Sequence, residues 1–314
     1  MKKIHNLGFF NFGNIGDEAY RLAFPKLFPD YEFVFCNSLK NVETDTVILG
    51  GGDVLSNDFI SQVKKYNKKY AFSVNYRDED IFIFDEVIAR NFNSKVPYYP
   101  DFAFILEGNK QNGRALIENL FLYNNLELYE NIVILTLNSY LCMKQNSELA
   151  RDYVNFDKVC YDLAKLMDNT CASFILMPFG NGYPHNDRIA NSAVYTKCKY
   201  WKKNLLLFNE LNVQETLDVF SAVNAAITTR LHAGIFSCIA EIPFIDITHH
   251  SKTGLFLESI GKSEWGVDYW HFDYWKTLNL LDDFLKNKTK YKKEVNIINN
   301  HAKELLRPLQ NKKL

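Results

Sequence analysis

The residues best suited to bind an anion lie where a buried strand in the second half of the chain ends. The run Ala225–Thr228 is followed by Arg230 and His232, which stand at the start of an apolar helical pattern. Arginine offers a planar pair of donors to a carboxylate or phosphate, and imidazole titrates near neutral pH. The positive end of the helix dipole would add to this attraction. A single histidine at a strand end is usually structural, but this Arg-x-His pair at a helix entrance favours binding or catalysis.

A second polar group follows the next buried strand, Phe244–Ile247. It contains His249, His250 and Lys252. In isolation such a group is most simply a solvated loop. Because parallel strands deliver their carboxyl ends to one edge of a sheet, it would instead form one basic pocket with the preceding arginine and histidine.

Two glycine-rich turns follow predicted strands in the N-terminal part. The segment 13–18 (GNIGDE) contains Asn14 and Asp17, and Asp17 is placed to cap the following helix. Backbone N–H groups at such a turn can bind an anion or a sugar hydroxyl, and the alternative is a tight turn that touches nothing. The run Gly50–Gly52 comes directly after a buried strand. Consecutive glycines lose much chain entropy on folding, so they favour a sharp bend or a close approach to a ligand.

Short β-branched and aromatic runs alternate with helical patterns, which predicts an α/β fold built on parallel sheets. The predicted strands are Ile4–Phe10, Glu32–Phe35, Thr46–Leu49, Lys69–Val74, Glu86–Ala89, Val96–Tyr99, Ile132–Leu137, Ser173–Met177, Leu205–Phe208, Ala225–Thr228 and Phe244–Ile247. The predicted helices are Tyr20–Lys26, Phe59–Tyr66, Leu116–Tyr129, Asp152–Asp168, Val213–Ser221 and Ala233–Ile239. We predict two α/β domains with a cleft between them, at residues 1–112 and 113–285, followed by a basic tail at 286–314.

Composition and charge exclude some classes of function. The chain has 314 residues, 47% of them hydrophobic, which is enough to bury a large core. A net charge of −1 argues against a protein that coats nucleic acid. No apolar stretch resembles a signal peptide or reaches the ~18 residues of a membrane helix. Six scattered cysteines in a chain without an export signal predict a cytoplasmic protein with reduced thiols.

In their order and spacing these features resemble the polysaccharide pyruvyltransferase family, over most of the chain. The resemblance is carried by GNIGDE at 13–18, GGG at 50–52, Arg90 with Ser94, PDFAF at 100–104, RLHA at 230–233, and Pro243 with Lys252. One departure is Glu241, which stands where relatives usually carry glycine.

The resemblance implies two Rossmann-like domains similar to the GT-B glycosyltransferase architecture. We assign the acceptor to the N-terminal domain and the donor to the C-terminal domain. Members of the family transfer the enolpyruvyl unit of phosphoenolpyruvate as a cyclic ketal onto two hydroxyls of one hexose, and release phosphate. Some act on lipid-linked precursors of capsules, exopolysaccharides or cell-wall polymers.

Ketal formation needs an acid that protonates the methylene carbon of the donor, and cations that hold its carboxylate and phosphate. We predict His232 as this acid/base. The predicted substrate-binding residues are Arg230, Leu231, Arg90, Lys252, His249, Asn14, Asp17, Gly51 and Gly52. An alternative leaves His232 to bind phosphate and gives the acid role to His249 or His185. The chemistry requires no metal and no cofactor, so we predict neither.

Two other functions fit the same architecture. A nucleotide-sugar glycosyltransferase typically carries a glutamate about two turns along the helix that follows His232, and that position is Ala240 here, beside Glu241. A non-catalytic carbohydrate-binding protein is disfavoured because the arginine, histidine and lysine are all present.

Two further segments have open interpretations. The segment 264–275 holds three of the four tryptophans, which either stack on the sugar acceptor or pack inside the protein. The tail 286–314 carries nine lysines and arginines against Glu294 and Glu304. We expect it to close the fold as a helix, with outward lysines able to contact an anionic membrane where a lipid-linked acceptor is presented.

Overall fold

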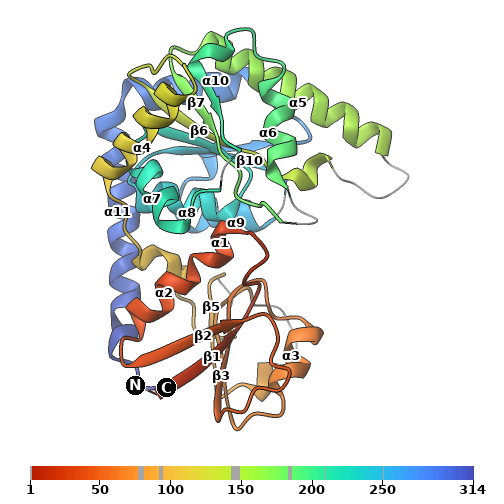
Figure 1. The fold of residues 1–314 in the computed structure, drawn as a ribbon, viewed down its shortest axis with the longest axis vertical. Coiled ribbons are helices and arrows are strands. Elements are labelled where there is room, and N and C mark those ends of the chain that lie inside the picture. Colours follow the sequence, from red (N-terminus) through yellow and green to blue (C-terminus); the bar gives the residue numbers. More distant parts are fainter. Residues whose placement is uncertain are drawn as a thin grey trace. The chain divides into compact units, whose positions relative to one another are not determined.

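The computed structural model describes residues 2–76, 81–91, 95–142, 149–182, 186–208, 210–249 and 251–314. The chain divides into two compact units (Figure 1). Unit 1 contains Met1–Leu106 and Asn299–Leu314, and unit 2 contains Glu107–Ile298.

Unit 1 is built on five parallel strands in the order β2-β1-β3-β4-β5. The strands are β1 (Lys2–Leu7), β2 (Tyr31–Cys36), β3 (Thr46–Gly52), β4 (Lys68–Val74) and β5 (Glu86–Ala89). The helices are α1 (Ile15–Glu18), α2 (Tyr20–Leu27) and α3 (Asn57–Val63), with 3-10 turns at Ile81–Ile83 and Phe102–Ile105. All of β3 is buried, which explains its continuous apolar and glycine sequence.

Two different cores cover the faces of this sheet. An aromatic core includes Phe24, Phe28, Phe72 and Phe102 with ring centroids 5.4–6.4 Å apart. The other core is mainly aliphatic and includes Leu7, Val47, Leu49, Ile60 and Val63. Alternation of side chains along β4 places Ala71 in the aliphatic core and the next residue, Phe72, in the aromatic one.

Unit 2 is built on six parallel strands in the order β11-β10-β9-β6-β7-β8. The strands are β6 (Ile132–Thr136), β7 (Ser173–Leu176), β8 (Asn204–Leu206), β9 (Ala225–Thr228), β10 (Phe244–Thr248) and β11 (Gly266–Asp268). The helices are α4 (Lys110–Tyr123), α5 (Leu149–Asn169), α6 (Asp187–Tyr195), α7 (Val213–Ser221), α8 (Leu231–Ile239), α9 (Ser251–Ser259), α10 (Tyr274–Lys286) and α11 (Lys288–Leu306). Short 3-10 turns lie at Ser139–Cys142, Trp201–Lys203, Ser263–Trp265 and Arg307–Asn311, the last of them in unit 1.

The observed elements differ from the predicted ones in a few places. The predicted strand Val96–Tyr99 is reduced to one isolated bridge between Ala89 and Tyr98. The helix predicted at Leu116–Tyr129 begins earlier, at Lys110, because the Asn109 side chain accepts hydrogen bonds from two first-turn N–H groups. The helices α1, α6, α9 and α10 and the strand β11 were not predicted.

The units also divide at other positions than the predicted 112/113 and 286. The segment after Leu106 belongs to unit 2 because its backbone packs directly on α7. A side chain at Gly113 would collide with the Asp218 backbone, and the Asn109 N–H donates to Asp218 Oδ1 at 2.7 Å. The tail is divided within α11, and its end joins unit 1, where the Leu314 N–H donates to the Tyr31 hydroxyl at 2.6 Å.

The aromatic segment 264–275 is divided between core and surface. Trp265 is 2% exposed, and its ring packs against those of Phe244 and Phe284 with centroids 5.7 and 5.2 Å away. Packing is therefore the observed role of this tryptophan. Trp270 and Trp275 are 39% and 66% exposed. Among the described residues, none of the helices combines the length and the apolar character that crossing a membrane requires.

Candidate active site

An arginine–carboxylate pair forms the centre of the candidate site in unit 2. Arg230 Nε and Nη2 donate to the two carboxylate oxygens of Asp187 at 3.0 and 2.5 Å. The Asp187 side chain is fully buried, and that of Arg230 is 15% exposed. A two-point pair of this kind fixes the plane of the guanidinium group. The pair therefore holds the Nε and Nη2 groups of Arg230 in place against Asp187.

The Asp187 carboxylate is held in turn by the backbone. It accepts hydrogen bonds from the N–H groups of Ser139, Phe179 and Gly180 at 2.8–3.1 Å. These groups belong to the segments that follow β6 and β7, and Arg230 follows β9. The segments after these three strands therefore all contact the Asp187 carboxylate. Asp187 is not among the residues predicted from the sequence. Its one local signal is its place directly after the helix-capping Asn186.

The helix α8 begins directly after this arginine. Arg230 is its N-cap residue, and no described side chain caps this end of the helix. The first-turn N–H groups at Leu231 and His232 therefore face the end of β9, as an anion-binding helix terminus requires. His232 is 8% exposed. Close packing of α8 on β10 sets its position, since a side chain at Gly234 would meet the Phe244 ring at 3.0 Å.

The neighbouring strand β10 brings the other basic residues to the same edge. It pairs with β9 in parallel, with Asp246 opposite Thr228. Lys252 lies exposed in the first turn of α9, and His249 is half-buried with its ring centroid 6.4 Å from that of Tyr269. The structure thus brings the segments of Arg230, Leu231, His232, His249 and Lys252 to one edge of one sheet. His250 and His185 lie outside the described residues.

A buried carboxyl group lies beneath this edge. Asp246 is 2% exposed, and its Oδ2 accepts a hydrogen bond from the Thr248 hydroxyl at 2.8 Å. Burial raises the pKa of Asp246 to about 6, against the hydrogen bonds from Thr253 and Thr248, which lower it. Thr253 stands beside Lys252 in α9, so the ionisation of Asp246 is coupled to the start of that helix.

We expect the substitution Asp246→Asn to change how stability depends on pH. The pKa of Asp246 in the folded protein lies above its unfolded value of 3.8, so the folded state binds this proton more tightly. The free energy of unfolding therefore falls as the pH rises from about 4 through about 6. The asparagine variant lacks this loss and should exceed the wild type by about 2–3 kcal/mol at pH 8, with no such excess at pH 4. Urea unfolding of both proteins across this range tests the prediction, and parallel curves would contradict it.

A second set of predicted residues lies at the carboxyl ends of β1 and β3 in unit 1. Asn14 caps α1 by accepting from the Gly16 N–H at 3.1 Å, and its Nδ2 donates to Asp17 Oδ2 at 2.6 Å. Gly52 has φ of +106°, and a side chain there would lie 3.0 Å from Asp17 Oδ1. The two glycine-rich turns of the sequence therefore meet at the Asp17 carboxylate.

The same turns also enclose a buried polar network. The Tyr20 hydroxyl donates to Asp101 Oδ2 at 2.5 Å, and Arg90 Nη1 donates to both groups at 2.6 and 2.7 Å. Burial and Asp101 raise the pKa of Tyr20, against Arg90, which lowers it. Burial lowers the pKa of Arg90, but Tyr20 and Asp101 raise it by more than burial lowers it. The pKa is therefore above its usual value, and the arginine remains charged.

This environment favours a positioning role for Arg90. Its side chain is 6% exposed, Nε donates to Asn75 Oδ1 at 2.8 Å, and Nη1 is held by the network. These contacts do not support the predicted donor-binding role of Arg90, because its side chain is buried and its charge is paired with the Asp101 carboxylate. Arg90 and the Arg230 segment lie in different units, and Ser94 lies outside the described residues.

Gly51 is the position where the triple glycine is most constrained. Its φ is +85°, and an added Cβ would lie 2.5 Å from the Tyr20 ring. We expect Gly51→Ala to lower the free energy of unfolding by about 2–4 kcal/mol, through backbone strain and displacement of the ring. Gly254→Ala is the matched control, since its Cβ would meet only the Thr248 methyl at 3.5 Å in a helix, where alanine is favoured. Equal thermal shifts for the two variants would contradict the prediction.

The described residues contain no group of three or more histidine, cysteine, aspartate or glutamate side chains that could hold a metal ion. The candidate site in unit 2 is therefore a basic edge centred on one buried ion pair. That in unit 1 is a glycine-rich turn around a carboxylate.

The class of fold is that of a two-domain α/β protein with a parallel sheet in each domain. A UDP-GlcNAc 2-epimerase from Neisseria meningitidis, bound to UDP-GlcNAc, is similar with a TM-score of 0.60 and 9% identity, over 99% of this chain and 100% of that one. The S. aureus protein MnaA, in a structure with UDP, is similar with a TM-score of 0.62 and 8% identity, over 94% and 91% of the two chains. At these identities the similarity shows the fold alone. It confirms the predicted class of two Rossmann-like domains of the GT-B kind.

The family is established by the sequence. The model of the polysaccharide pyruvyl transferase family matches residues 14–251, and no curated protein sequence matches the chain. The protein belongs to the polysaccharide pyruvyl transferase family and is a transferase. The matched range contains the motifs at 50–52 and 230–233 and all but the first residue of the motif at 13–18, so the predicted family is confirmed.

Proposed function

We propose that the protein transfers the enolpyruvyl unit of phosphoenolpyruvate, as a cyclic ketal, onto two hydroxyls of one hexose in a polysaccharide precursor. A proton adds to the methylene carbon of the donor, which makes the carbon bearing carboxylate and phosphate electrophilic. One sugar hydroxyl attacks this carbon, and phosphate leaves with the proton of that hydroxyl. The second hydroxyl then closes the ring and loses its proton.

The observation that carries this proposal is the Arg230–Asp187 pair at the N-terminus of α8. The reaction needs a fixed cation that binds an anion without reorganising, and this guanidinium group is held from behind by a buried carboxylate. Its Nη1 edge, the first-turn N–H groups and the nearby Lys252 would hold the carboxylate and phosphate of the donor. Family membership supports the choice of a pyruvyl donor over other anions.

His232 is the acid/base in this proposal. It stands two residues beyond Arg230 and is mostly shielded from water, which suits a group that must exchange a proton with a bound donor. Unit 2 would then be the donor side. Unit 1 would be the acceptor side, where Asp17 and the backbone of Gly51 and Gly52 would form hydrogen bonds with sugar hydroxyls. Arg90 would stabilise this turn through its contacts with Tyr20 and Asp101.

Incubation with phosphoenolpyruvate and a lipid-linked galactoside tests the proposal. Mass spectrometry should show the acceptor gaining one pyruvate ketal, and phosphate should be released in equal amount. Phosphate release without the mass change would indicate hydrolysis of the donor and would contradict transfer to this acceptor. Repeating the assay with other lipid-linked hexoses would define the acceptor.

The nucleotide-sugar alternative finds little support at the helix end where its glutamate would lie. Ala240 is the C-cap of α8, and Glu241 has φ of +58° with Oε1 accepting from Asn296 Nδ2 of α11 at 2.5 Å. The carboxylate of Glu241 is thus engaged with α11. A thermal-shift comparison separates the two functions, because a bound ligand stabilises the fold. Phosphoenolpyruvate should raise Tm, and UDP-sugars should not.

We also propose that the protein works at the cytoplasmic surface of a membrane, where a lipid-linked acceptor is presented. The lysines of the C-terminal segment include Lys286, Lys288 and Lys292, which are 37–76% exposed and paired with carboxylates only at 3.7–3.9 Å. Exposed pairs this long contribute little, so these cations remain available to anionic lipids.

Each such lysine would contribute about 1 kcal/mol near an anionic leaflet. At low salt the protein should sediment with phosphatidylglycerol vesicles, remain in solution with phosphatidylcholine vesicles, and be released by high salt. Equal recovery in the supernatant with both lipids at low salt would exclude this surface role.

A further inference from the structure

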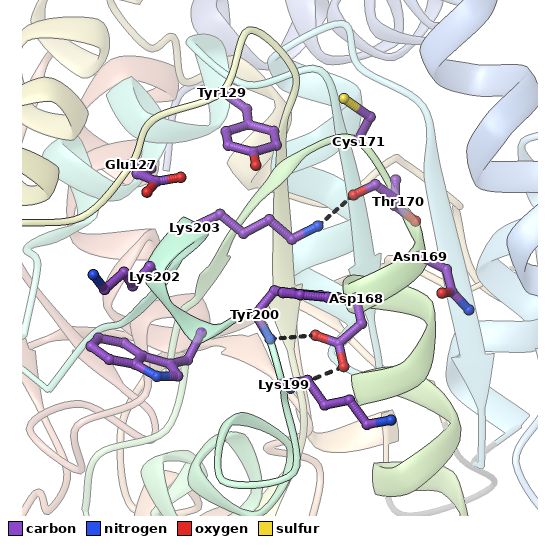
Figure 2. A pocket seen from close by; sticks show the side chains of 11 residues that line it. Glu127, Tyr129, Asp168, Asn169, Thr170, Cys171, Lys199, Tyr200, Lys202 and Lys203 are labelled. Atoms are coloured by element: carbon purple, nitrogen blue, oxygen red, sulfur yellow. Dashed lines mark hydrogen bonds between the residues drawn. The ribbon is translucent and has the colours of Figure 1, made fainter.

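A pocket of about 630 Å³ lies in unit 2 at the opposite edge of the sheet from the candidate active site. It is formed by residues that precede strands, with Tyr129 before β6, Cys171 before β7 and Lys203 before β8, and by the end of α5 (Figure 2). Its lining residues are Glu127, Tyr129, Asp168, Asn169, Thr170, Cys171, Lys199, Tyr200, Trp201, Lys202 and Lys203. The catalytic chemistry proposed at the carboxyl ends of β9 and β10 makes no use of this pocket.

Lys203 is a buried cation inside the pocket. It is 5% exposed, and its Nζ donates one hydrogen bond, to Thr170 O at 2.5 Å. An ammonium group has three donors, so two of them are not used in this hydrogen bond. Burial lowers the pKa of Lys203, against Asp168, which raises it. A buried ammonium with two unused donors in an open pocket calls for an anionic partner.

The loop that carries Lys203 is held in place. The Asp168 carboxylate accepts hydrogen bonds from the N–H groups of Lys199 and Tyr200 at 3.0 and 2.9 Å (Figure 2). These bonds use the Asp168 oxygens and fix the turn before β8. Lys203 Nζ lies 5.6 Å from the centroid of the Tyr129 ring, so one wall of the pocket beside the cation is aromatic.

The rest of the lining combines aromatic surface with polar groups of both signs. Trp201 and Tyr200 are 48% and 64% exposed at the pocket. Exposed tryptophan and tyrosine faces suit the apolar face of a sugar ring. Glu127 adds a carboxylate that can accept from hydroxyls, and it repels a doubly charged phosphate group more strongly than a singly charged sugar carboxylate.

We propose that this pocket binds an acidic saccharide, with a sugar carboxylate on Lys203 Nζ and the sugar ring against Trp201. The cavity volume lies within the range of about 300–1,000 Å³ that ligand sites usually have. The choice of a saccharide among carboxylates rests on the proposed function, since a polysaccharide-modifying enzyme meets such chains. A site remote from the strand ends of β9 and β10 would hold a neighbouring stretch of glycan without competing with the donor.

Calorimetric titration of the full chain with digalacturonate, galactobiose and inorganic phosphate tests the proposal. Digalacturonate should bind, while galactobiose and phosphate should each bind at least ten-fold more weakly. Lys203→Met keeps the length of the side chain and should weaken digalacturonate binding at least ten-fold. Trp201→Ala changes an exposed residue and should weaken it about five-fold, so the test stands even where the buried substitution disturbs folding.

Lys276→Met is the matched control. Lys276 Nζ also donates to a backbone carbonyl, that of Gly266 at 2.5 Å, but lies away from the pocket lining. Its substitution should leave digalacturonate binding unchanged. Absence of digalacturonate binding, equal binding by all three variants, or phosphate binding as tight as digalacturonate would overturn the proposal.

The proposed function is tested separately in the same proteins by the thermal shift with phosphoenolpyruvate. Lys203→Met should keep the full shift. A lost shift in the wild type with digalacturonate binding retained would reject the donor and leave the saccharide site standing. A retained shift with phosphoenolpyruvate and no digalacturonate binding would reject the saccharide site and leave the donor standing.

Discussion

The His232→Gln variant is expected to lose transfer activity by about two to four orders of magnitude while still binding phosphoenolpyruvate. Removing a general acid from a proton transfer in the transition state has this effect on kcat. Glutamine keeps a polar group on the first turn of α8 but cannot deliver a proton. The substitution leaves the proposed donor clamp of Arg230, Lys252 and the helix N-terminus in place, so binding of the donor should fall less than ten-fold.

His271→Gln is the control for this experiment. Its side chain is 88% exposed and contacts Asp268 in the same unit. Turnover should stay near the wild-type value. Near wild-type turnover in His232→Gln would remove His232 from the mechanism and direct attention to His249 or His185. Loss of donor binding together with turnover would assign His232 to the phosphate site instead.

The Arg230→Ala variant is expected to bind phosphoenolpyruvate more weakly by about 2–5 kcal/mol, which corresponds to about 30-fold to several thousand-fold in Kd. A donor held away from water would lose its strongest charge-assisted partner. Isothermal calorimetry measures this loss directly. Arg114→Ala is the matched control, because its exposed ion pair with Glu118 on α4 contributes little.

The structure adds a second consequence for Arg230→Ala. Truncation leaves the fully buried Asp187 without its cation, which typically costs about 3–5 kcal/mol of stability. The double variant Arg230→Met, Asp187→Asn removes both charges and should recover much of this stability without recovering donor binding. Wild-type affinity in the double variant would mean that the donor clamp is built from other residues.

The single variant Asp187→Asn tests positioning alone. In this variant the Arg230 guanidinium group remains charged but loses one of its two contacts with residue 187. We therefore expect KM for phosphoenolpyruvate to rise about ten-fold with the fold retained. Rescue of KM by Asp187→Glu is not expected, since the longer side chain cannot also accept from Phe179 and Gly180. Unchanged KM in Asp187→Asn would contradict the positioning role.

Much of the fold and part of the site could be predicted from local sequence. Buried strands are recognised in the sequence as apolar runs. The local pattern after β9 is sufficient to place Arg230 and His232 at the start of a helix. The glycines at 50–52 also act within a few residues of themselves. Such features depend on backbone conformation and side-chain periodicity, which short segments already encode. The helix cap predicted at Asp17 was wrong, because Asn14 caps α1 and Asp17 lies inside that helix.

The partners of these residues were decided by the tertiary structure. Asp187 reaches Arg230 across 43 positions, and Tyr20 reaches Asp101 across 81. Neither separation leaves a periodic signal, because strand order determines which loops meet. The structure thereby buries Arg90 in a network with Tyr20 and Asp101, and holds the Nε and Nη2 groups of Arg230 on Asp187. The same holds for the pocket around Lys203, where the segments before β6, β7 and β8, which are ordinary in sequence, bury one lysine. By itself the sequence determined the family, most of the strands and the residue types at the strand ends. Only the packing of the sheets decided which carboxylates pair with Arg90 and Arg230, because burial beside a partner is a property of the folded chain.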